Sequence, residues 1–480
     1  MNHGVKVRQE ATSVGTPIVA DSGIPFFIGA APVQSAANPA PAGEPVLCTS
    51  WDEAKERFGF ADFDFAAKNW KYNLSECMYS HFKLFGMQPA IICNLLDPAS
   101  MASVVAATDI PVSDKKALLP LEAINDGSLV VKAAGGSGDA LVLDTDYSVF
   151  YSDENLTIAL LSDGAVYSAD QINVEYKVVT PASVTPTLVA TGMENIEKCM
   201  TSAGGVIPDL VCAPSFSQDV TVAAVMATKT TINGLFGAKA LIDISSAATG
   251  ATSYTAAAAL KNANNLVDPD QIVCWPMLRL GDRIFHMSTQ MAGLIPTVDN
   301  SDENGGIPVE SPSNKEFKAN GMVLEGGAPL TLTHAQANIL NANGICTALN
   351  FLGGWVAWGN YNACYPMNND VKDYFIPISR MFDWVGNTVV KTFWKRLDKP
   401  MNERRRDNII DTCNIWLNGV VGAGFLLGAR VEVRPEDNPL SDLMAGIIKV
   451  RIYLTPAGPM QEIVFILEYD HNYVTAAFAA

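Results

Sequence analysis

The hydrophobic positions divide the chain into segments with helical spacing and segments with strand character. Residues 24–31 and 90–95 are continuous apolar runs typical of buried strands, and residues 65–85 place apolar side chains at helical spacing between them. A capping-box pattern at residues 50–53 indicates a short helix that ends near Gly59. This succession of helices and strands predicts an α/β domain.

From about residue 101 the pattern changes to short alternating runs separated by Gly and Asp. The runs expected to be strands are residues 128–132, 147–151, 156–160 and 171–176. We interpret the region as a small all-β insertion that leaves the α/β domain and returns to it through a Pro/Thr-rich linker at residues 180–186. Four acidic residues in it lack the spacing of a calcium loop and are interpreted as turn residues: Asp144, Asp146, Asp153 and Glu154.

The α/β pattern then resumes. Helices are expected near residues 192–203 and 218–234, strands at 210–214 and 239–244, and a Gly/Pro/acidic loop at 299–312. A helix over residues 333–343 opens a C-terminal α+β region, which continues through a Gly/Trp-rich segment and two helix-like stretches to β-runs at residues 446–454 and 460–469.

The last of these runs, residues 461–469, is apolar on both faces at its centre. We therefore expect a strand covered on both sides, inserted into a sheet of its own chain or of a neighbour. Residues 4–10 alternate apolar and polar positions, which predicts a second terminal strand that needs docking.

The resulting expectation is an α/β plus β fold with several domains, completed by N- and C-terminal strands. We predict a terminal extension with its linker (residues 1–23), a first part of an α/β core (24–100), the β-rich insertion (101–183), the second part of the core (184–332), a C-terminal α+β assembly domain (333–454) and a C-terminal extension (455–480).

Composition supports a folded, acidic protein. Of 480 residues, 49% are hydrophobic and 17% charged, which is unlike a disordered chain, and the formal charge of −18 argues against nucleic acid as a general partner. The nine cysteines are scattered without a C-x-x-C pair, so we expect buried free thiols and a reducing compartment during folding. Neither a secretory signal nor a segment of membrane-spanning length is recognised.

No catalytic motif emerges. The five histidines lack motif context, and G-x-S-x-G, P-loop, H-E-x-x-H and G-x-G-x-x-G patterns are missing from the sequence. Residues 422–428 resemble a nucleotide loop loosely and are interpreted as a helix end followed by a strand. His286 and His334 are interpreted as structural histidines. We expect no enzyme, no cofactor and no metal site.

One basic tract stands out against the acidic background. Seven basic residues fall within sixteen positions: Lys391, Lys395, Arg396, Lys399, Arg404, Arg405 and Arg406. They can form a solvated helix face, or they can make an electrostatic contact to an acidic partner. We expect Phe393, Trp394 and Leu397 on the first of two helices, and a core face containing Cys413 on the second.

The order of segments resembles the contractile tail sheath proteins of bacteriophages and related injection particles. The resemblance is carried by residues 4–10, 24–31, 58–59, 82–86 and 90–92, by residues 143–147 and 173–176 of the insertion, and most specifically by residues 291–294, Asp299, Gly306 and residues 310–315, 340–345 and 358–360. Tyr361 departs from the pattern, because the family often has a basic residue followed by Thr there, while residues 373–380 again resemble the family.

The resemblance implies a structural subunit that stacks as six-membered rings around a tail tube and contracts to drive the tube through the host envelope. Implied partners are further copies of the chain, the tube protein, and baseplate and tail terminator proteins, without direct nucleic-acid contact or membrane insertion. The implied location is the tail sheath of a virion, assembled in the host cytoplasm.

The family arrangement also gives roles to particular residues. Terminal strands that join neighbouring subunits correspond to Val5, Lys6, Val7 and Arg8 and to Ile463, Val464, Phe465, Ile466 and Leu467, with hinges at residues 11–17 and 455–459. Contacts to the tube correspond to the basic tract, above all Lys391, Lys395, Arg396, Arg404, Arg405 and Arg406. Two alternatives stay open: the sheath of a phage-derived bacteriocin or secretion particle, and a tail or baseplate protein whose insertion binds glycans.

Overall fold

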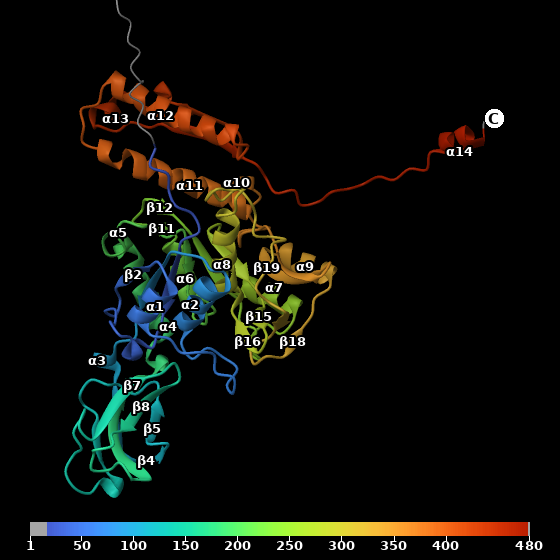
Figure 1. The fold of residues 1–480 in the computed structure, drawn as a ribbon. Helices are drawn as coiled ribbons and strands as arrows, with labels where there is room; N and C mark the ends of the chain where they lie inside the picture. The colour runs from blue at the N-terminus through green and yellow to red at the C-terminus, as the bar shows by residue number, and fades with distance from the viewer. Residues whose placement is uncertain (1–16, 479–480) are drawn as a thin grey trace, which may run out of the picture.

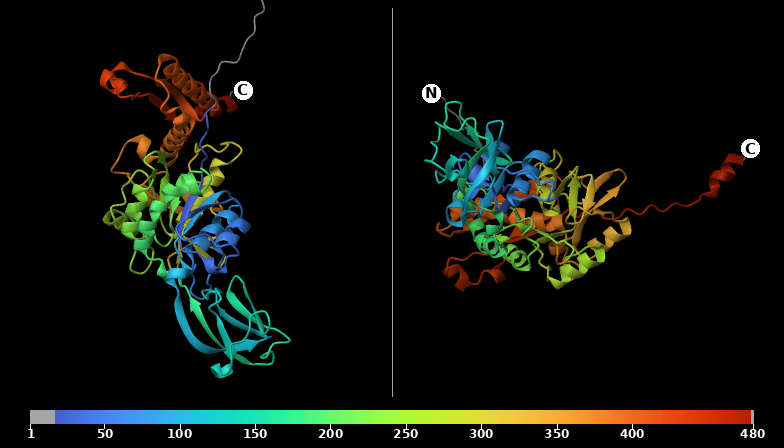
Figure 2. Two further views of the ribbon diagram at one scale, coloured as in Figure 1. Left: turned by 90° about the vertical axis from the view of Figure 1, so that its left-hand side faces the viewer. Right: turned by 90° about the horizontal axis from the view of Figure 1, so that it is seen from below.

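The computed structural model describes residues 17–478, so the strand predicted at residues 4–10 lies outside the described residues. Figure 1 shows an elongated arrangement: an α/β body lies in the middle, the β insertion lies at one end, and a pair of long helices lies at the other. Figure 2 shows that the last residues extend away from this body as an arm. Among the described helices, none is both long and apolar enough to span a membrane.

An eight-stranded sheet forms the centre of the body. Its order is β2-β3-β1-β10-β13-β14-β19-β20, with inner neighbours parallel and the two outermost strands antiparallel to theirs. The strands are β1 Pro25–Gly29, β2 Pro45–Cys48, β3 Ala90–Asn94, β10 Leu210–Cys212, β13 Lys239–Asp243, β14 Gln271–Cys274, β19 Ile345–Phe351 and β20 Gly354–Trp358. Every residue of β1, β3, β10, β13 and β14 is buried, which explains their continuous apolar runs.

Helices cover both faces of this sheet, and alternate strand residues point to either face. Phe27 and Ile92 pack in one apolar cluster, whereas Phe26 and Ile91 pack in the other. The helices on the first face are α1 Trp51–Phe58, α2 Asn73–Met78 and α8 Met287–Asp299. Those on the second are α4 Pro186–Gly192, α6 Val220–Thr228, α7 Tyr254–Ala263 and α9 His334–Asn341.

The helix predicted over residues 65–85 begins eight residues late, at Asn73, and continues as a π-helical turn, Tyr79–Leu84. Residues 65–72 form turns instead, because Trp70 donates its indole N–H to the carbonyl of Ile284 at 2.8 Å and packs in a separate apolar cluster. The apolar spacing that suggests a helix there therefore serves a different contact. The capping-box helix is confirmed: Ser50 accepts a hydrogen bond from the Glu53 amide.

Two other helix predictions need correction. The helix expected at residues 192–203 begins earlier, with Thr185 capping α4, and proceeds through a 3₁₀ segment, Met193–Lys198, to α5 Cys199–Ser202. The helix expected at 218–234 ends at Thr228, and the chain then forms a small hairpin of β11 Thr231–Ile232 with β12 Phe236–Gly237.

The insertion is a six-stranded antiparallel sheet in the order β6-β9-β4-β5-β8-β7. It starts after α3 Pro98–Met101 and contains β4 Ser103–Ser113, β5 Lys116–Pro120, β6 Val130–Ala133, β7 Tyr147–Tyr151, β8 Asn155–Leu160 and β9 Gln171–Val178. All four predicted strands are present, and β4 and β5 are additional. The sheet has its own apolar cluster, which includes Leu119, Val131 and Ile158.

A second small sheet lies beside the body, in the order β16-β15-β17-β18. Its strands are β15 Met277–Leu280, β16 Arg283–Phe285, β17 Gly321–Val323 and β18 Pro329–Leu330.

The C-terminal region consists of α10 Val371–Tyr374, α11 Ile376–Phe393, α12 Glu403–Gly422, β21 Leu426–Glu432, α13 Leu440–Met444, β22 Arg451–Pro456 and α14 His471–Phe478. β22 lies a few residues later than the predicted run at 446–454.

The predicted strand at residues 461–469 is wrong for the single subunit. No strand forms there, and a helix, α14, follows instead. A strand needs a partner to satisfy its backbone groups, and this segment extends away from the rest of its own chain (Figure 2).

Candidate functional site

The helix α11 is fixed to the α/β body by a buried ion network. The Arg380 guanidinium donates to both oxygens of Asp299, at 2.6 and 3.0 Å, and to Asp209 at 3.1 Å. Ser22 donates a further 2.6 Å bond to Asp299. Burial opposes the charge on Arg380, but the two carboxylates outweigh it and raise the pKa of Arg380. Four segments that are distant in sequence therefore meet at one cation.

A second buried cation, on β13, contacts α11 about one turn after Arg380. Lys239 is 1% exposed and forms ion pairs with Asp270 and, at 2.8 Å, with Asp383 of α11. Asn387, also on α11, bonds the backbone of Gly237 through both its oxygen and its nitrogen, at 2.8 and 2.9 Å. The helix thus cannot shift along the body without breaking both networks.

The first described residues of the chain run along α11. The amides of Ile18 and Ala20 donate to the hydroxyls of Thr392 and Thr388, at 2.9 and 3.0 Å, and the Trp384 indole donates to the Ala20 carbonyl at 2.9 Å. The N-terminal segment therefore reaches the body from the end of the molecule that carries the two long helices (Figure 1).

A two-stranded sheet, β21 with β22, packs on these helices through an apolar cluster that includes Met381, Trp384, Leu417 and Val431. Within residues 17–478 the sheet has no third strand, so the outer edge of each strand is unpaired. A surface groove of about 440 Å³ follows the sheet and is lined by apolar side chains and backbone that include Phe382, Ala429, Ile452 and Leu454. An open edge next to an apolar groove is a template for an added strand.

The arm carries a matching apolar segment. Ile463, Val464, Phe465, Ile466 and Leu467 are 63%, 70%, 82%, 81% and 93% exposed. Soluble monomers rarely expose such a run, which therefore marks an interaction segment. The sequence pattern identified this segment and its apolar character, although not its conformation in a single subunit.

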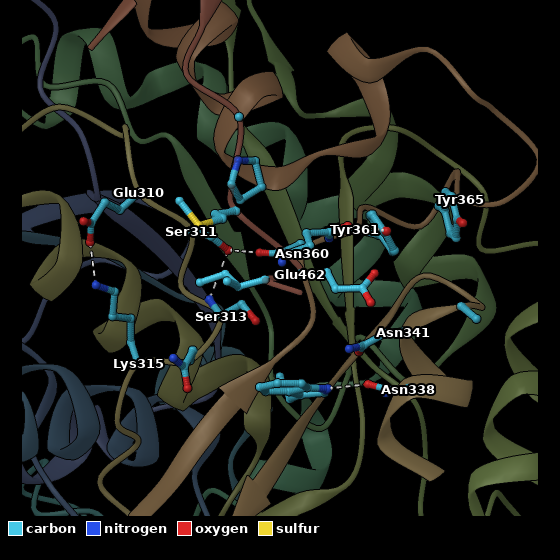
Figure 3. A pocket seen from close by; sticks show the side chains of 18 of the residues that line it. Glu310, Ser311, Ser313, Lys315, Asn338, Asn341, Asn360, Tyr361, Tyr365 and Glu462 are labelled. Carbon is cyan, nitrogen blue, oxygen red and sulfur yellow. Dashed lines mark hydrogen bonds and ion pairs between the residues drawn. The ribbon is translucent and has the colours of Figure 1, made fainter. Parts of the chain in front are cut away.

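A polar groove of about 1020 Å³ lies where the arm leaves the body (Figure 3). The body contributes Ser311, Ser313, Asn338, Asn360 and aromatic rings, and the arm contributes residues 457–463. Ser311 donates to the Asn360 amide oxygen, and the Trp358 indole donates to Asn338 at 2.9 Å. The segments at 310–315 and 358–360, which carry the family resemblance, contribute part of its lining.

The basic tract spans the end of α11, the connection to α12 and the first turn of α12. Lys391 pairs with Asp21 at 3.1 Å, and Arg406 pairs with Glu403 and Asp407 at 3.1 and 2.8 Å. Arg396 bonds Asn408. Exposed positions at the turn are Lys395, Lys399, Arg404 and Arg405.

The helix α11 ends at Phe393, so Trp394 and Leu397 do not lie on it as predicted. They are 55% and 59% exposed at the turn, beside the cations. Cys413 does lie on the core face of α12, 3% exposed.

One cluster, in which Glu76 and His286 are buried and Ser215 is exposed, has the components of a hydrolytic triad. His286 Nδ1 lies 2.9 Å from Glu76, and Nε2 lies 3.4 Å from the hydroxyl of Ser215. Burial opposes protonation, but Glu76 and Asp243 raise the pKa of His286 to about 9, so the imidazole is a cation at neutral pH and cannot accept the serine proton. The amide of Phe216, which follows the serine, donates to Ala213 and is not free to stabilise an oxyanion.

Among the described residues, no group of three or more His, Cys, Asp or Glu side chains has the geometry of a metal site. All nine cysteines are buried free thiols, as predicted. Among the acidic turn residues of the insertion, Asp146 accepts from the amides of Val142 and Ala165, at 2.8 and 2.9 Å, and Asp153 pairs with Lys55 at 2.6 Å.

The tyrosines of the insertion mostly serve its own structure. Tyr147 and Tyr176 are 4% and 8% exposed, and the Tyr151 hydroxyl donates to the Ala123 carbonyl at 2.8 Å. An aromatic platform for a sugar is therefore not assembled from these three residues.

Comparison with known proteins decides between the possibilities. No protein-family profile matches the chain. The tail sheath protein of Burkholderia phage BcepMu is 22% identical over 98% of this chain and 97% of its own length. The major tail sheath protein of Serratia phage KSP20 is 27% identical over 30% of this chain and 36% of its own.

Solved structures agree on the fold. The sheath of an extracellular contractile injection system, PVC, in its contracted state is 13% identical and covers 98% of this chain and 99% of its own, with a TM-score of 0.57. The contracted helical sheath of the anti-feeding prophage matches with the same TM-score, at 13% identity over 97% of this chain and 99% of its own. The chain is similar over nearly its full length to contractile tail sheath proteins.

A crystal structure of a sheath tail protein from Desulfitobacterium hafniense is also similar, at 12% identity, with 90% of this chain and 93% of its own covered and a TM-score of 0.51. The prediction of a sheath subunit is confirmed. A structural role is consistent with a triad-like cluster whose histidine is a cation. It is also consistent with an open sheet edge and an exposed apolar arm.

Sequence reasoning missed the ion networks that hold this sheath subunit together. A signal was present: Arg380 lies one turn after Ile376 and one turn before Trp384, so a lone cation interrupts the apolar face of an amphipathic helix. A charge in that position predicts a buried partner, although the pattern does not say which carboxylate supplies it.

Proposed function

We propose that the chain polymerises by donating its terminal strands to the β21–β22 sheets of neighbouring copies, forming stacked six-membered rings around a tail tube. The observation that carries this proposal is that one subunit has both halves of the joint. An unpaired sheet edge with an apolar groove lies on the C-terminal region, and an exposed apolar segment lies on the arm.

The energetics favour such a joint. Each backbone hydrogen bond of an added strand contributes about 0.5–1.5 kcal/mol net. Burying a Val, Leu, Ile or Phe side chain adds about 1.5–3 kcal/mol. The five residues Ile463 to Leu467 are all of these types, so a donated strand outweighs the cost of ordering a short arm.

The donor positions are Ile463, Val464, Phe465, Ile466 and Leu467 at the C-terminus and Val5, Lys6, Val7 and Arg8 at the N-terminus. The two-stranded sheet has one free edge for each. The linker at residues 455–459 and the one at 11–17 would absorb the change when rings rotate from the extended to the contracted state, which drives the tube through the host envelope.

We propose that the turn between α11 and α12 faces the tube. Its candidates are Lys391, Lys395, Arg396, Arg404, Arg405 and Arg406. Exposed Trp394 and Leu397 beside the cations give the turn the mixed apolar and basic character of an interaction surface. In a chain of net charge −18, this turn is suited to an acidic tube protein.

The role is structural and needs no catalysis or cofactor. The functional unit is a homo-oligomer in the tail of a virion, assembled in the host cytoplasm and bounded by baseplate and tail terminator proteins. Relatives include both phage sheaths and sheaths of injection systems, and the full-length similarity to a phage protein favours a phage tail over a bacteriocin or secretion particle.

Electron microscopy tests assembly. The full chain, expressed alone and with its tube protein, should form hollow striated cylinders. A variant ending at Pro459 should remain a folded monomer with unchanged circular dichroism and form no cylinders. Ordered cylinders from the truncated variant would refute strand donation by the arm, and an intact chain that never polymerises would refute the sheath role.

Charge reversal tests the tube contact. Replacing Lys395, Lys399, Arg404 and Arg405 by Glu should leave sheath rings intact and release the tube, because these residues are exposed in the subunit. Lys116→Glu is the control, because Lys116 is an exposed lysine on β5 of the insertion, away from the proposed joints and from the turn. Unchanged tube retention in the quadruple variant would remove the proposed contact.

A further inference from the structure

The polar groove beside the arm contains a specific contact between arm and body. The Tyr361 hydroxyl donates a 2.8 Å hydrogen bond to the side-chain oxygen of Gln461. The groove ends two residues later at Ile463, which is 63% exposed, and exposure rises to 93% at Leu467. The contact thus lies at the last point where the body can influence the direction of the arm.

The hydroxyl of Tyr361 is held in place by neighbouring rings. Tyr361 stacks on Tyr365 with ring centroids 4.1 Å apart and meets Tyr374 edge-on at 5.5 Å. Tyr361 also forms an isolated bridge with Phe375, directly before α11. Because α11 is tied to the body by Arg380 and Lys239, the position of this hydroxyl is fixed relative to the whole subunit.

The chain between the sheet and Gln461 can pivot. Pro456 is buried and paired with Leu426 at the end of β22, whereas Gly458 is exposed, and a Cβ added there would meet only the Ile378 side chain, at 3.8 Å. The groove of about 1020 Å³ beside residues 457–463 leaves room for a second course of the arm without any change in the core. Its hydroxyl and amide side chains can satisfy an extended backbone in more than one position (Figure 3).

We propose that this groove is a seat for the root of the C-terminal arm: the Tyr361–Gln461 hydrogen bond holds the arm in one exit direction, and its loss lets the arm swing within the groove. The inference concerns the single subunit and holds whether or not the arm is later donated. It supplies a way for a free subunit to present its arm in a defined direction before any neighbour is present, which lowers the entropy cost of capture.

Distance distributions between two spin labels test the seat. Labels at Asp302→Cys on the body and Glu468→Cys on the arm are both at exposed positions, and the native cysteines are buried. In the monomer, Tyr361→Phe should broaden the distribution, and the ratio of seated to free arms should fall about two- to twelvefold, the effect of one hydrogen bond.

Gln461→Met provides the second variant, because its exposed position on the arm cannot affect folding of the body. It should broaden the distribution as much as Tyr361→Phe, and the double variant should be no broader than either. Tyr374→Phe is the control, since it alters the same ring cluster and keeps the bond. A distribution unchanged in both Tyr361→Phe and Gln461→Met would overturn the proposal, as would equal broadening in Tyr374→Phe.

Discussion

Arg380 contacts carboxylates from two other parts of the chain, and each of these is itself buried. The side chain of Asp299 is 1% exposed and that of Asp209 is 14% exposed. Burial raises the pKa of Asp209 even though Arg380 opposes the shift. The arginine therefore does more than add one ion pair, because without it two acidic groups would remain in an apolar environment.

Arg380→Met should lower the free energy of unfolding by about 3–5 kcal/mol, the usual effect of leaving a buried charge without its partner. Arg451→Met, which removes the solvent-screened pair with Asp437, should lower the free energy of unfolding far less. Chemical denaturation of both monomers measures the difference. Equal losses in the two variants would show that the buried network does not anchor α11.

His286 predicts a specific pH dependence. Its folded pKa, about 9, lies above its ordinary value of 6.5 because Glu76 and Asp243 outweigh the effect of burial. Its contribution to stability is therefore fully present below pH 6.5 and is lost as the pH rises through about 9.

Denaturation of the wild type at a series of pH values from 6 to 10 should show this decline. His286→Gln should be less stable at neutral pH and lack the decline above pH 8. A wild-type stability that stays flat up to pH 10 would contradict the assignment of a charged imidazole.

At the scale of elements, sequence periodicity located most strands because buried strands are short, continuous and apolar. It failed at residues 65–72, where Trp70, a ring that suggested a helix, instead bonds the carbonyl of Ile284, 214 positions away. It failed again at 461–469, where the apolar pattern is typical of a covered strand but the single chain offers no partner. In both places the deciding interaction is not local, so no local pattern could reveal it.

The boundary between the two apolar cores does not coincide with the boundary of the insertion in the sequence. Leu121 lies between strands of the insertion yet packs in the core of the α/β body, whereas Leu119, two residues earlier, packs in the insertion's own core. The Gln34 side chain of the body donates a 3.0 Å hydrogen bond to the Leu121 carbonyl, which joins this residue to the body.

Leu119→Ala and Leu121→Ala should each cost about 2–5 kcal/mol, but in different thermal transitions. In calorimetry, Leu119→Ala should lower the transition of the insertion and Leu121→Ala that of the body. If both variants shift one common transition equally, the insertion and the body unfold as a single unit.

At the scale of the whole molecule, the buried thiols form a chemical test of the fold. Burial raises the pKa of Cys48, Cys93, Cys199 and Cys346 to about 12, so these groups are both inaccessible and protonated. A thiol reagent should label none of the nine cysteines in the native subunit and all nine in denaturant. Rapid labelling of any native cysteine would show that its core segment opens.

The two ends of the molecule differ in what they connect. Every joint proposed here lies at the end that carries α11, α12 and the arm, while the β insertion lies at the far end (Figure 1). The ion networks along α11 hold this helix and the body together. When a subunit rotates about its joints, the body acts as a lever, and the insertion is the part farthest from the joints.

A small rotation at the joints therefore produces a large displacement of the insertion. A probe attached near Gly138, an open position on an exposed loop of the insertion, would travel farther than one placed anywhere near the joints. The insertion is also the part that displaces the most surrounding fluid during such a turn. Its size and shape would set the hydrodynamic drag on the motion, and trimming it would leave the joints unchanged while letting the lever move faster.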